Sequence, residues 1–275
     1  MTIRAVHHLN CATMCPLAGR YIGIARMVAH CLLLETERDG LVLVDSGFGT
    51  RDVDGRSGLP MMFRRLVGPA LDPMETAVAQ VERLGFKAGD VRHVVVTHLD
   101  LDHAGGISDF PGATVHLHAR EHAAAMARVT RRERERYHAA HWSHGPTWSV
   151  YTENGETWRG LPAVTRLRGI DADIGLVPMH GHTRGHSAVI ANAGARWLVH
   201  AGDAYFHRHA VTDPPGSVPL ALRAFEKAVE TDGGARRASV SALRQLRASY
   251  DDVALFCAHD TEEFAALTAR PSSST

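Results

Sequence analysis

Lysine, cysteine and long apolar runs are scarce in this sequence. Lys87 and Lys227 are the two lysines among 30 basic residues, and 30 acidic residues bring the formal net charge to zero. A balanced charge gives no reason to expect nucleic acid or an anionic membrane as a partner. No apolar run approaches the ~18 residues of a membrane-spanning helix, and residues 1–8 lack the apolar core of a signal peptide. We therefore expect a cytoplasmic protein with no nucleic-acid partner and no membrane partner.

The length and composition are those of a globular protein with a substantial core. Four cysteines in 275 residues suggest no disulfide framework, and 45% of the residues are hydrophobic. No linker divides the chain, so we expect a single domain over residues 1–275 with its core at about 28–265. The tail at 270–275 (Arg-Pro-Ser-Ser-Ser-Thr) is predicted to be disordered.

Local patterns place several elements. Asp39-Gly40 is typical of a hairpin turn into the strand at 41–44. Residues 73–84 have helical apolar spacing, residues 119–142 form an arginine-rich helical pattern, and a helical region spans about 220–249. Residues 48–72 are predicted to be a long loop with one short helical piece. The arginines of 119–142 favour a solvated, salt-bridged face, with a lid or partner-binding helix as the alternative.

Histidine, by contrast, is abundant, and one stretch concentrates it with aspartate. The apolar run at 94–96 (Val-Val-Val) indicates a buried strand, and His98, Asp100, Asp102 and His103 follow it directly. Charges at the mouth of a buried strand cost several kcal/mol unless they are paired or bind a metal. This stretch therefore predicts a metal centre.

Three later strands also end on potential metal ligands. The residues that follow these strands are His182, Asp203 and His259. In α/β architectures, the carboxyl ends of the strands form the site. With the four earlier residues they make seven ligands, enough for two metals that share a carboxylate.

Five motifs in this order resemble those of the metallo-β-lactamase superfamily, most closely its N-acyl-homoserine-lactonase-like branch. They are Leu-Val-Leu-Val-Asp-Ser-Gly (41–47), Val-Val-Val-Thr-His-Leu-Asp-Leu-Asp-His-Ala-Gly-Gly (94–106), Gly-His-Thr-Arg-Gly-His-Ser (181–187), Gly-Asp-Ala (202–204) and Ala-His-Asp (258–260). The resemblance covers roughly residues 28–260. It implies an α/β fold, a four-layer αββα sandwich with a dinuclear site along one edge.

The resemblance also implies a role for each ligand. His98, Asp100 and His182 would hold the first metal, Asp102, His103 and His259 the second, and Asp203 would bridge them. In the family chemistry, a hydroxide between the metals attacks a carbonyl, the metals stabilise the oxyanion and an acid protonates the leaving alkoxide. Asp102 is a further candidate to orient the nucleophile.

Two nearby residues are expected to support the ligands. Asp45 either orients a ligand or caps the loop that follows it. His186 is favoured as a supporting residue over a ligand.

Asp100 departs from the family pattern, which has histidine at this position. Aspartate could ligate without a backbone shift, because its Oδ lies as many bonds from Cβ as the near ring nitrogen of histidine. Three carboxylates and a hydroxide would neutralise two divalent ions and weaken their Lewis acidity. The added oxygen ligand favours Mn or Fe over Zn, and flavodiiron proteins of this superfamily also resemble the chain in having a carboxylate there. The alternative is a degraded first site with one metal or none.

A second departure follows the predicted bridging aspartate. Lactonases of this branch resemble one another in having a tyrosine three residues after it, where this chain has Phe206. Tyr205 lies one position earlier and is the candidate catalytic electrophile or proton donor, with simple packing as the alternative.

Together these features predict a dinuclear metal-dependent hydrolase that opens a lactone or cleaves a carboxylic ester. The alternatives are a thioesterase of the glyoxalase II kind, a phosphoesterase, a redox diiron protein, and a non-catalytic ligand-binding member. The expected partner is a small-molecule ester or lactone, and a homodimer is one option for the assembly. The loops at 48–72, 138–160 and 204–219 are expected to select the substrate.

Overall fold

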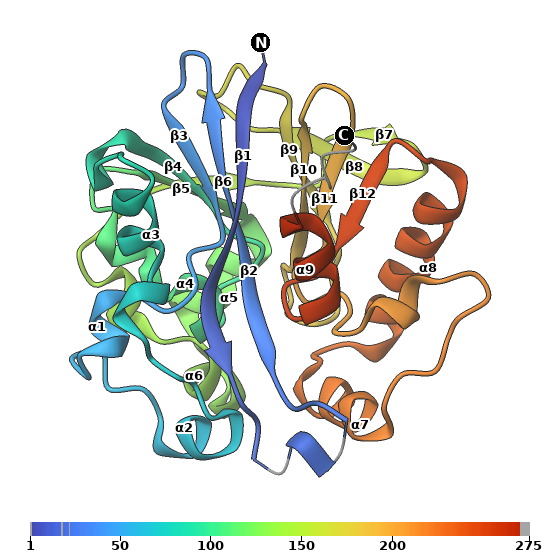
Figure 1. Ribbon diagram of the computed structural model, residues 1–275, viewed down its shortest axis with the longest axis horizontal. Coiled ribbons are helices and arrows are strands. Elements are labelled where there is room, and N and C mark those ends of the chain that lie inside the picture. Colours follow the sequence, from blue (N-terminus) through green and yellow to red (C-terminus); the bar gives the residue numbers. More distant parts are fainter. Residues whose placement is uncertain (1, 18, 22, 270–275) are drawn as a thin grey trace, which may run out of the picture.

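Two six-stranded sheets form the centre of the protein (Figure 1). The computed structural model describes residues 2–17, 19–21 and 23–269, so the predicted disordered tail at 270–275 lies outside the described residues. The first sheet contains, in spatial order, β1 (Ile3–Met14), β2 (Met27–Thr36), β3 (Leu41–Val44), β4 (Val91–Val95), β5 (Thr114–His118) and β6 (Thr147–Tyr151). The second contains β12 (Val253–Phe256), β11 (Trp197–His200), β10 (Ser187–Asn192), β9 (Ile174–Pro178), β8 (Leu161–Arg166) and β7 (Glu156–Trp158).

Strand direction determines where the polar loops gather. The parallel pairs are β3–β4, β4–β5 and β5–β6 in the first sheet and β11–β12 in the second. The remaining neighbours are antiparallel. Parallel strands end at the same edge of a sheet, so the loops after β4, β11 and β12 can form a shared site.

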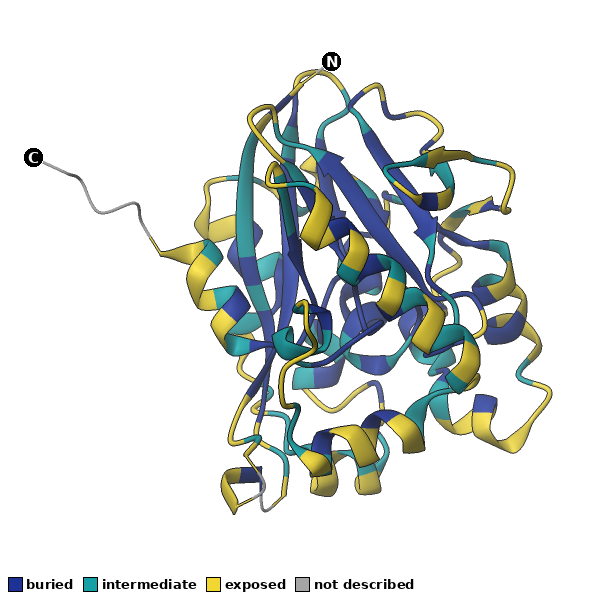
Figure 2. Ribbon diagram, turned by 90° about the vertical axis from the view of Figure 1, so that its right-hand side faces the viewer, coloured by how far each residue is buried: buried dark blue, intermediate teal, exposed yellow. Residues whose placement is uncertain are grey.

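Helices flank the two sheets on both sides of the molecule (Figure 1). In Figure 2, which looks onto one of these sides, the helices in front are exposed on their outer sides and the strands behind them are buried. The α-helices are α1 (Thr50–Val53), α2 (Met61–Val67), α3 (Ala77–Arg83), α4 (Leu101–Ala104), α5 (Ala119–Ala127), α6 (Arg131–Arg136), α7 (Leu220–Val229), α8 (Gly233–Ser249) and α9 (Thr261–Thr268). The 3₁₀ helices are η1 (Gly19–Tyr21), η2 (Pro73–Glu75), η3 (Ala88–Asp90), η4 (Gly105–Asp109), η5 (Ala139–Trp142) and η6 (Arg208–Val211).

Three apolar layers hold these elements together. Leu34 and Val44 of the first sheet pack with Leu176 and Phe256 of the second in the layer between the sheets. A second layer joins the first sheet to α3 and α5, and a third joins the second sheet to α8. This arrangement confirms the predicted four-layer αββα sandwich.

Several local predictions hold, and others fail for identifiable reasons. The hairpin at Asp39-Gly40 is present between β2 and β3. The predicted helix at 73–84 is divided into η2 and α3, because the extended Thr76 caps α3 by accepting a hydrogen bond from the amide of Ala79. Residues 48–72 contain two helices, α1 and α2, in place of the one predicted.

β1 extends the first sheet beyond the predicted start of the core at residue 28. It pairs with β2 along most of its length and buries Ile3 and Leu9. The polar pair His7 and His8 interrupts the apolar pattern that would have revealed the strand.

Candidate metal centre

The seven predicted ligands meet at one edge of the two sheets. His98 follows β4, and Asp102 and His103 lie in α4, which begins directly after Asp100. The remaining three follow β9, β11 and β12, and are His182, Asp203 and His259. Asp100 occupies the N-cap position of α4, yet its side chain makes no capping hydrogen bond. Its carboxylate is therefore available to the site.

His98, Asp100 and His182 form the first cluster. Their nearest side-chain donor atoms all lie within 4.8 Å of one another. Oδ2 of Asp100 is 3.0 Å from Nε2 of His182 and 3.4 Å from Nε2 of His98. The structure thus brings Asp100 together with the two histidines predicted to share a metal with it.

Asp102, His103 and His259 form the second cluster, with the same 4.8 Å limit between their donor atoms. Oδ2 of Asp102 lies 3.6 Å from Nε2 of His259 and 4.0 Å from Nε2 of His103. The side chain of Asp102 is about one-eighth exposed, whereas the two histidines are buried. Asp102 is therefore the most exposed member of this cluster.

Asp203 lies between the two clusters and offers one oxygen to each. Its Oδ1 is 3.0 Å from Nε2 of His259 and 3.3 Å from Nε2 of His103. Its Oδ2 is 3.4 Å from Nε2 of His182 and 3.8 Å from Nε2 of His98. This division of one carboxylate between two sets of donors is the geometry required for a bridging ligand.

The chemistry of the donor set fits cations. Nε2 of His98, Nε2 of His103 and Oδ1 of Asp203 are buried without a hydrogen-bond partner among the residues that the structure describes. Each such orphaned group costs about 1–3 kcal/mol. Burial alone would raise the pKa of Asp203, but His259 and His103 outweigh it and hold that pKa well below its ordinary value. The carboxylate is therefore ionised, and divalent ions would satisfy these atoms.

Asp45 orients one histidine in each cluster. Its Oδ2 accepts a 2.8 Å hydrogen bond from Nδ1 of His103 and a 2.9 Å bond from the hydroxyl of Thr97. The Thr97 oxygen in turn lies 2.9 Å from Nδ1 of His98. Tethering Nδ1–H in this way leaves Nε2 with a free lone pair. Of the two roles considered for Asp45, the structure shows the orienting one.

His186 supports Asp203 from the backbone side. Its Nδ1 donates to the carbonyl of Met179 at 2.8 Å, and its Nε2 accepts from the amide of Asp203 at 2.9 Å. Both ring nitrogens are thereby used, as expected for a supporting residue. Gly202 has a positive φ of 52°, and a Cβ there would lie 2.6 Å from Nε2 of His186, so a larger residue would displace this contact.

Glu121 of α5 joins two motif loops and was missed by the sequence reasoning. It is fully buried. One oxygen accepts from the amide of Leu99 at 3.0 Å, and the other accepts from the Thr183 hydroxyl at 2.6 Å and the Gly185 amide at 3.0 Å. In the sequence, Glu121 is followed by small apolar residues, and this hint of burial could have identified it. The many other charged residues of 119–142 made it look like part of an exposed face.

Arg136, at the end of α6, is the second residue that was missed. Its Nε lies 3.0 Å from Oδ1 of Asp100, and its two terminal nitrogens donate to the carbonyls of His182 (2.9 Å) and Val229 (2.6 Å). Burial would raise the pKa of Asp100, but the charge of Arg136, with His98, holds it well below its usual range. The solvated face predicted for the arginines of 119–142 therefore does not describe Arg136, which is mostly buried.

Tyr205 points away from the ligands. Its side chain is fully buried, and its hydroxyl donates to the carboxylate of Glu263, 3.2 Å from each oxygen. Burial raises the pKa of this phenol far above its ordinary value. Phe206 lines the adjoining cavity, whereas Tyr205 is not among its lining residues. This placement argues against the predicted catalytic role of Tyr205 and favours packing.

A cavity of about 820 Å³ opens beside the clusters. Asp100, Asp102, His182, Asp203 and His259 lie in its wall. The rest of the lining is mainly apolar and comes from residues 14, 16, 17, 24 and 27, from α2 with Pro60, from α7 with Phe206, and from Leu101. α6 adds the charged residues Glu135 and Arg136. Of the three loops expected to select the substrate, the one at 48–72 contributes α2 and the one at 204–219 contributes Phe206. No residue of 138–160 is among the lining residues described.

Comparison with known proteins places this site in a family. Residues 25–259 match the family profile of the metallo-beta-lactamase superfamily. A probable metallo-hydrolase of Mycobacterium tuberculosis is 45% identical over 260 residues, which is 94% of this chain and 80% of that protein. An N-acyl homoserine lactonase of Rhizobium johnstonii is 38% identical over 81 residues, 30% of this chain and 31% of the relative.

Solved structures share the fold of this chain. The structure of an N-acyl homoserine lactone hydrolase, with the product N-hexanoyl-L-homoserine bound at its catalytic metal center, matches 99% of this chain and 98% of its own. The TM-score is 0.71 and the identity 19%. Profile, sequence relatives and fold agree with the geometry of the clusters, and the chain belongs to the metallo-β-lactamase superfamily as a probable metal-dependent hydrolase.

Proposed function

We propose that this protein is a dinuclear metal-dependent hydrolase that opens a lactone, or cleaves a carboxylic ester, carrying an apolar acyl chain. The observation that carries the proposal is Asp203, whose two oxygens face two separate clusters at 3.0–3.8 Å. The apolar cavity beside Asp102 supplies room for the acyl chain.

The ligand assignment follows the clusters. His98, Asp100 and His182 would hold one ion and Asp102, His103 and His259 the other, with Asp203 shared. Two bound divalent ions supply Lewis acidity for the carbonyl and a nucleophile at neutral pH. The donor set of four imidazoles and three carboxylates is compatible with Zn, Mn or Fe.

Arg136 changes the charge expected of this site. With Asp100 as a ligand, three carboxylates and a hydroxide would neutralise two divalent ions. The guanidinium 3.0 Å from Oδ1 of Asp100 returns one positive charge to the same place. We propose that the pair of Asp100 and Arg136 replaces the charge of the usual neutral histidine, so the Lewis acidity of the centre is less reduced than Asp100 alone would imply.

Asp102 is the group that we propose to handle the proton. Its carboxylate is at the wall of the cavity and makes no hydrogen bond to the described residues, so it can accept the proton of an attacking water. The same carboxyl can then return the proton to the leaving alkoxide. His186 and Glu121 would hold the backbone of the ligand loops in place during this step.

The cavity favours a neutral ester over a phosphoester. Arg136 is its lining arginine, and all three of its donor groups already face Asp100 or backbone carbonyls. A phosphoester anion would therefore find no free side-chain cation among the described lining residues. The product-bound lactone hydrolase of the same fold supports a lactone further.

The test is a substrate panel with the metal-reconstituted protein. Acid release would be followed by pH-stat for lactones with short and long acyl chains, for carboxylic esters, thioesters and phosphoesters, each with Zn, Mn and Fe. We expect metal-dependent turnover of lactones or esters that improves with chain length, and none in Asp203→Ala. Turnover confined to thioesters or phosphoesters, or iron that reacts with oxygen without hydrolysis, would overturn the proposal.

A further inference from the structure

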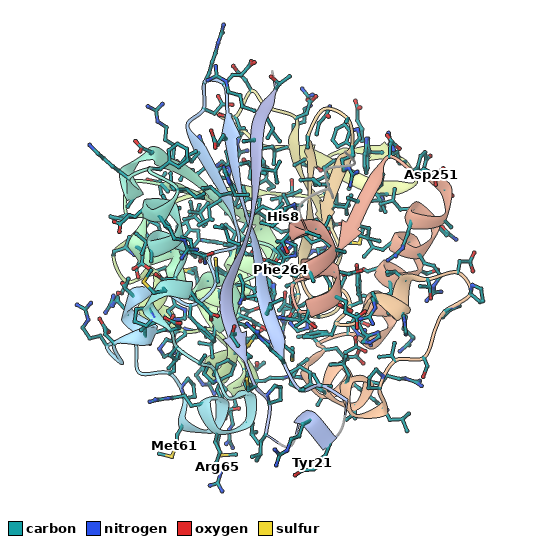
Figure 3. The ribbon with its side chains drawn as sticks, in the orientation of Figure 1. His8, Tyr21, Met61, Arg65, Asp251 and Phe264 are labelled. Carbon is teal, nitrogen blue, oxygen red and sulfur yellow. The ribbon has the colours of Figure 1, made fainter. Side chains whose placement is uncertain are left out.

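Exposed apolar side chains gather around the mouth of the cavity. Met61 is 82% exposed, Leu220 79% and Tyr21 75%. Figure 3 shows Tyr21 and Met61 projecting from the same end of the molecule, together with Arg65. We call the following set of exposed residues the mouth patch: Leu17, Tyr21, Met61, Met62, Leu66, Leu220 and Phe225.

The mouth patch is continuous with the cavity. Five of its members also line the cavity wall, namely Leu17, Met61, Met62, Leu66 and Phe225. Scattered single apolar residues on a surface need no explanation, but a contiguous apolar surface around a site indicates a binding face. The apolar wall that is proposed to receive an acyl chain therefore extends to the outer surface of the protein.

The segments that carry the mouth patch are strongly basic. Residues 15–27, 59–71 and 214–229 contain one acidic residue, Glu226, which is buried and accepts from the amide of Phe206. The same segments carry six exposed basic residues: Arg20, Arg26, Arg64, Arg65, Arg223 and Lys227. Glu135 of α6 is an exposed acidic residue in the same cavity wall, but it is paired with Arg131 at 2.8 Å. The zero net charge of the whole chain thus conceals an excess of positive charge in the segments of the mouth patch.

We propose that the mouth patch is a docking surface for an anionic lipid membrane. The apolar side chains would enter the boundary between headgroups and acyl chains, and the basic residues would contact the anionic headgroups. Apolar insertion and electrostatic attraction together produce this kind of peripheral binding. It requires no spanning segment, and every helix in the described part of the chain is too short or too polar to cross a bilayer.

Charge decides between lipid and the other candidate partner. A second copy of this chain would bring six basic residues against six, and the like charges oppose self-association through this face. An anionic bilayer is complementary to both components of the surface. Docking in this orientation would open the cavity directly toward the lipid, from which an apolar substrate could enter.

Vesicle binding tests the proposal independently of the reaction. The metal-loaded protein would be sedimented with vesicles of phosphatidylcholine alone and with vesicles containing about one third phosphatidylglycerol. We expect binding to the mixed vesicles that weakens with added salt, and little binding to phosphatidylcholine alone. Arg64→Glu combined with Arg65→Glu should lower the partition coefficient about tenfold or more. A triple change of Met61, Met62 and Leu66 to Ser should also lower it.

Matched controls separate the mouth patch from general effects. Arg83→Glu with Arg237→Glu makes the same change in net charge on α3 and α8, and Leu84→Ser with Val129→Ser removes exposed apolar surface that does not line the cavity. We expect both controls to bind vesicles as the wild type does. Failure of the wild-type protein to bind anionic vesicles would overturn the proposal. So would equal losses in the controls, or a dimer that the triple change converts to monomer without altering vesicle binding.

Discussion

The first and second clusters contain similar donors but are held in different ways. In the second cluster, Nδ1 of His103 is fixed by Asp45 and Nδ1 of His259 by the carbonyl of Val28 at 2.7 Å. In the first cluster, Nδ1 of His182 is buried without a partner among the described residues, and Asp100 is held by Arg136. Both histidines of the second cluster are therefore fixed by hydrogen bonds, whereas the first cluster is fixed at His98, through Thr97, and otherwise depends on one ion pair with a helix.

Removing the shared ligand should erase the difference between the clusters. Asp203→Ala deletes the carboxylate oxygens that the two clusters face. The surrounding histidines are buried, so no other side chain can take the place of this carboxylate. We expect both metals to be lost or weakened, with kcat/KM lower by about a thousandfold or more. Metal content by elemental analysis and hydrolysis of a lactone would be measured together. Retention of two tightly held metals would contradict the bridging role.

Asp45→Asn should affect the second cluster most. It weakens the acceptor for Nδ1 of His103 while leaving Asp100 and Arg136 untouched. The metal affinity should fall about 10–100-fold, measured by competition with a chromogenic chelator. His98 is reached only through Thr97, so its site should lose less. An equal loss at both sites would show that the clusters are not held separately.

Arg136→Gln should affect the first cluster alone. The change removes the charge beside Asp100 and two donors to backbone carbonyls, so the affinity of one metal should fall about tenfold. Arg132→Gln is the matched control on the same helix, since Arg132 is exposed and bonds the carbonyl of Ala228. A shift in the pH profile of kcat would accompany the loss if Arg136 maintains the charge of the centre. Unchanged metal binding would refute the positioning role.

Asp100→His should make the first cluster resemble the family pattern. The added imidazole replaces an oxygen ligand, so preference should move toward Zn relative to Mn by a few-fold. Competition between the two ions, read by elemental analysis, gives the ratio. Because Arg136 would then face a neutral ring, the double change Asp100→His with Arg136→Gln should bind Zn better than Asp100→His alone. The opposite order would mean that Arg136 acts mainly through the backbone of His182.

Tyr205→Phe should produce the smallest effect and leave both clusters intact. The hydroxyl bonds Glu263 away from the cavity, so kcat/KM should stay within about twofold, while the free energy of unfolding falls by about 1 kcal/mol. Activity and urea unfolding would be measured on the same preparation. A large drop in kcat with unchanged stability would restore the catalytic role predicted for Tyr205.

The ligands could be read from the sequence because each follows a local pattern. An apolar strand ending on His98, or on Asp203, is visible within a few residues, and the architecture then brings strand ends together. Arg136 and Glu121 could not be found in this way. Their partners lie tens of positions away, and within their own helices both look like ordinary members of a charged face.

The distribution of charge over the surface could not be derived from the sequence for a similar reason. A total of zero says nothing about where the charges lie, and the basic residues of 15–27, 59–71 and 214–229 are far apart in the chain. Only the folded arrangement places α2 and α7 in the wall of one cavity. The strand β1 was missed because its burial depends on pairing with β2.

The guanidinium of Arg136 also joins three parts of the molecule that the chain itself leaves separate. It extends from α6 to the side chain of Asp100, to the backbone at His182 after β9, and to the last residue of α7. α7 supplies Leu222 and Phe225 to the cavity wall. The shape of the cavity and the spacing of the first cluster therefore depend on the same side chain, so a displacement of α7 would disturb the position of Asp100.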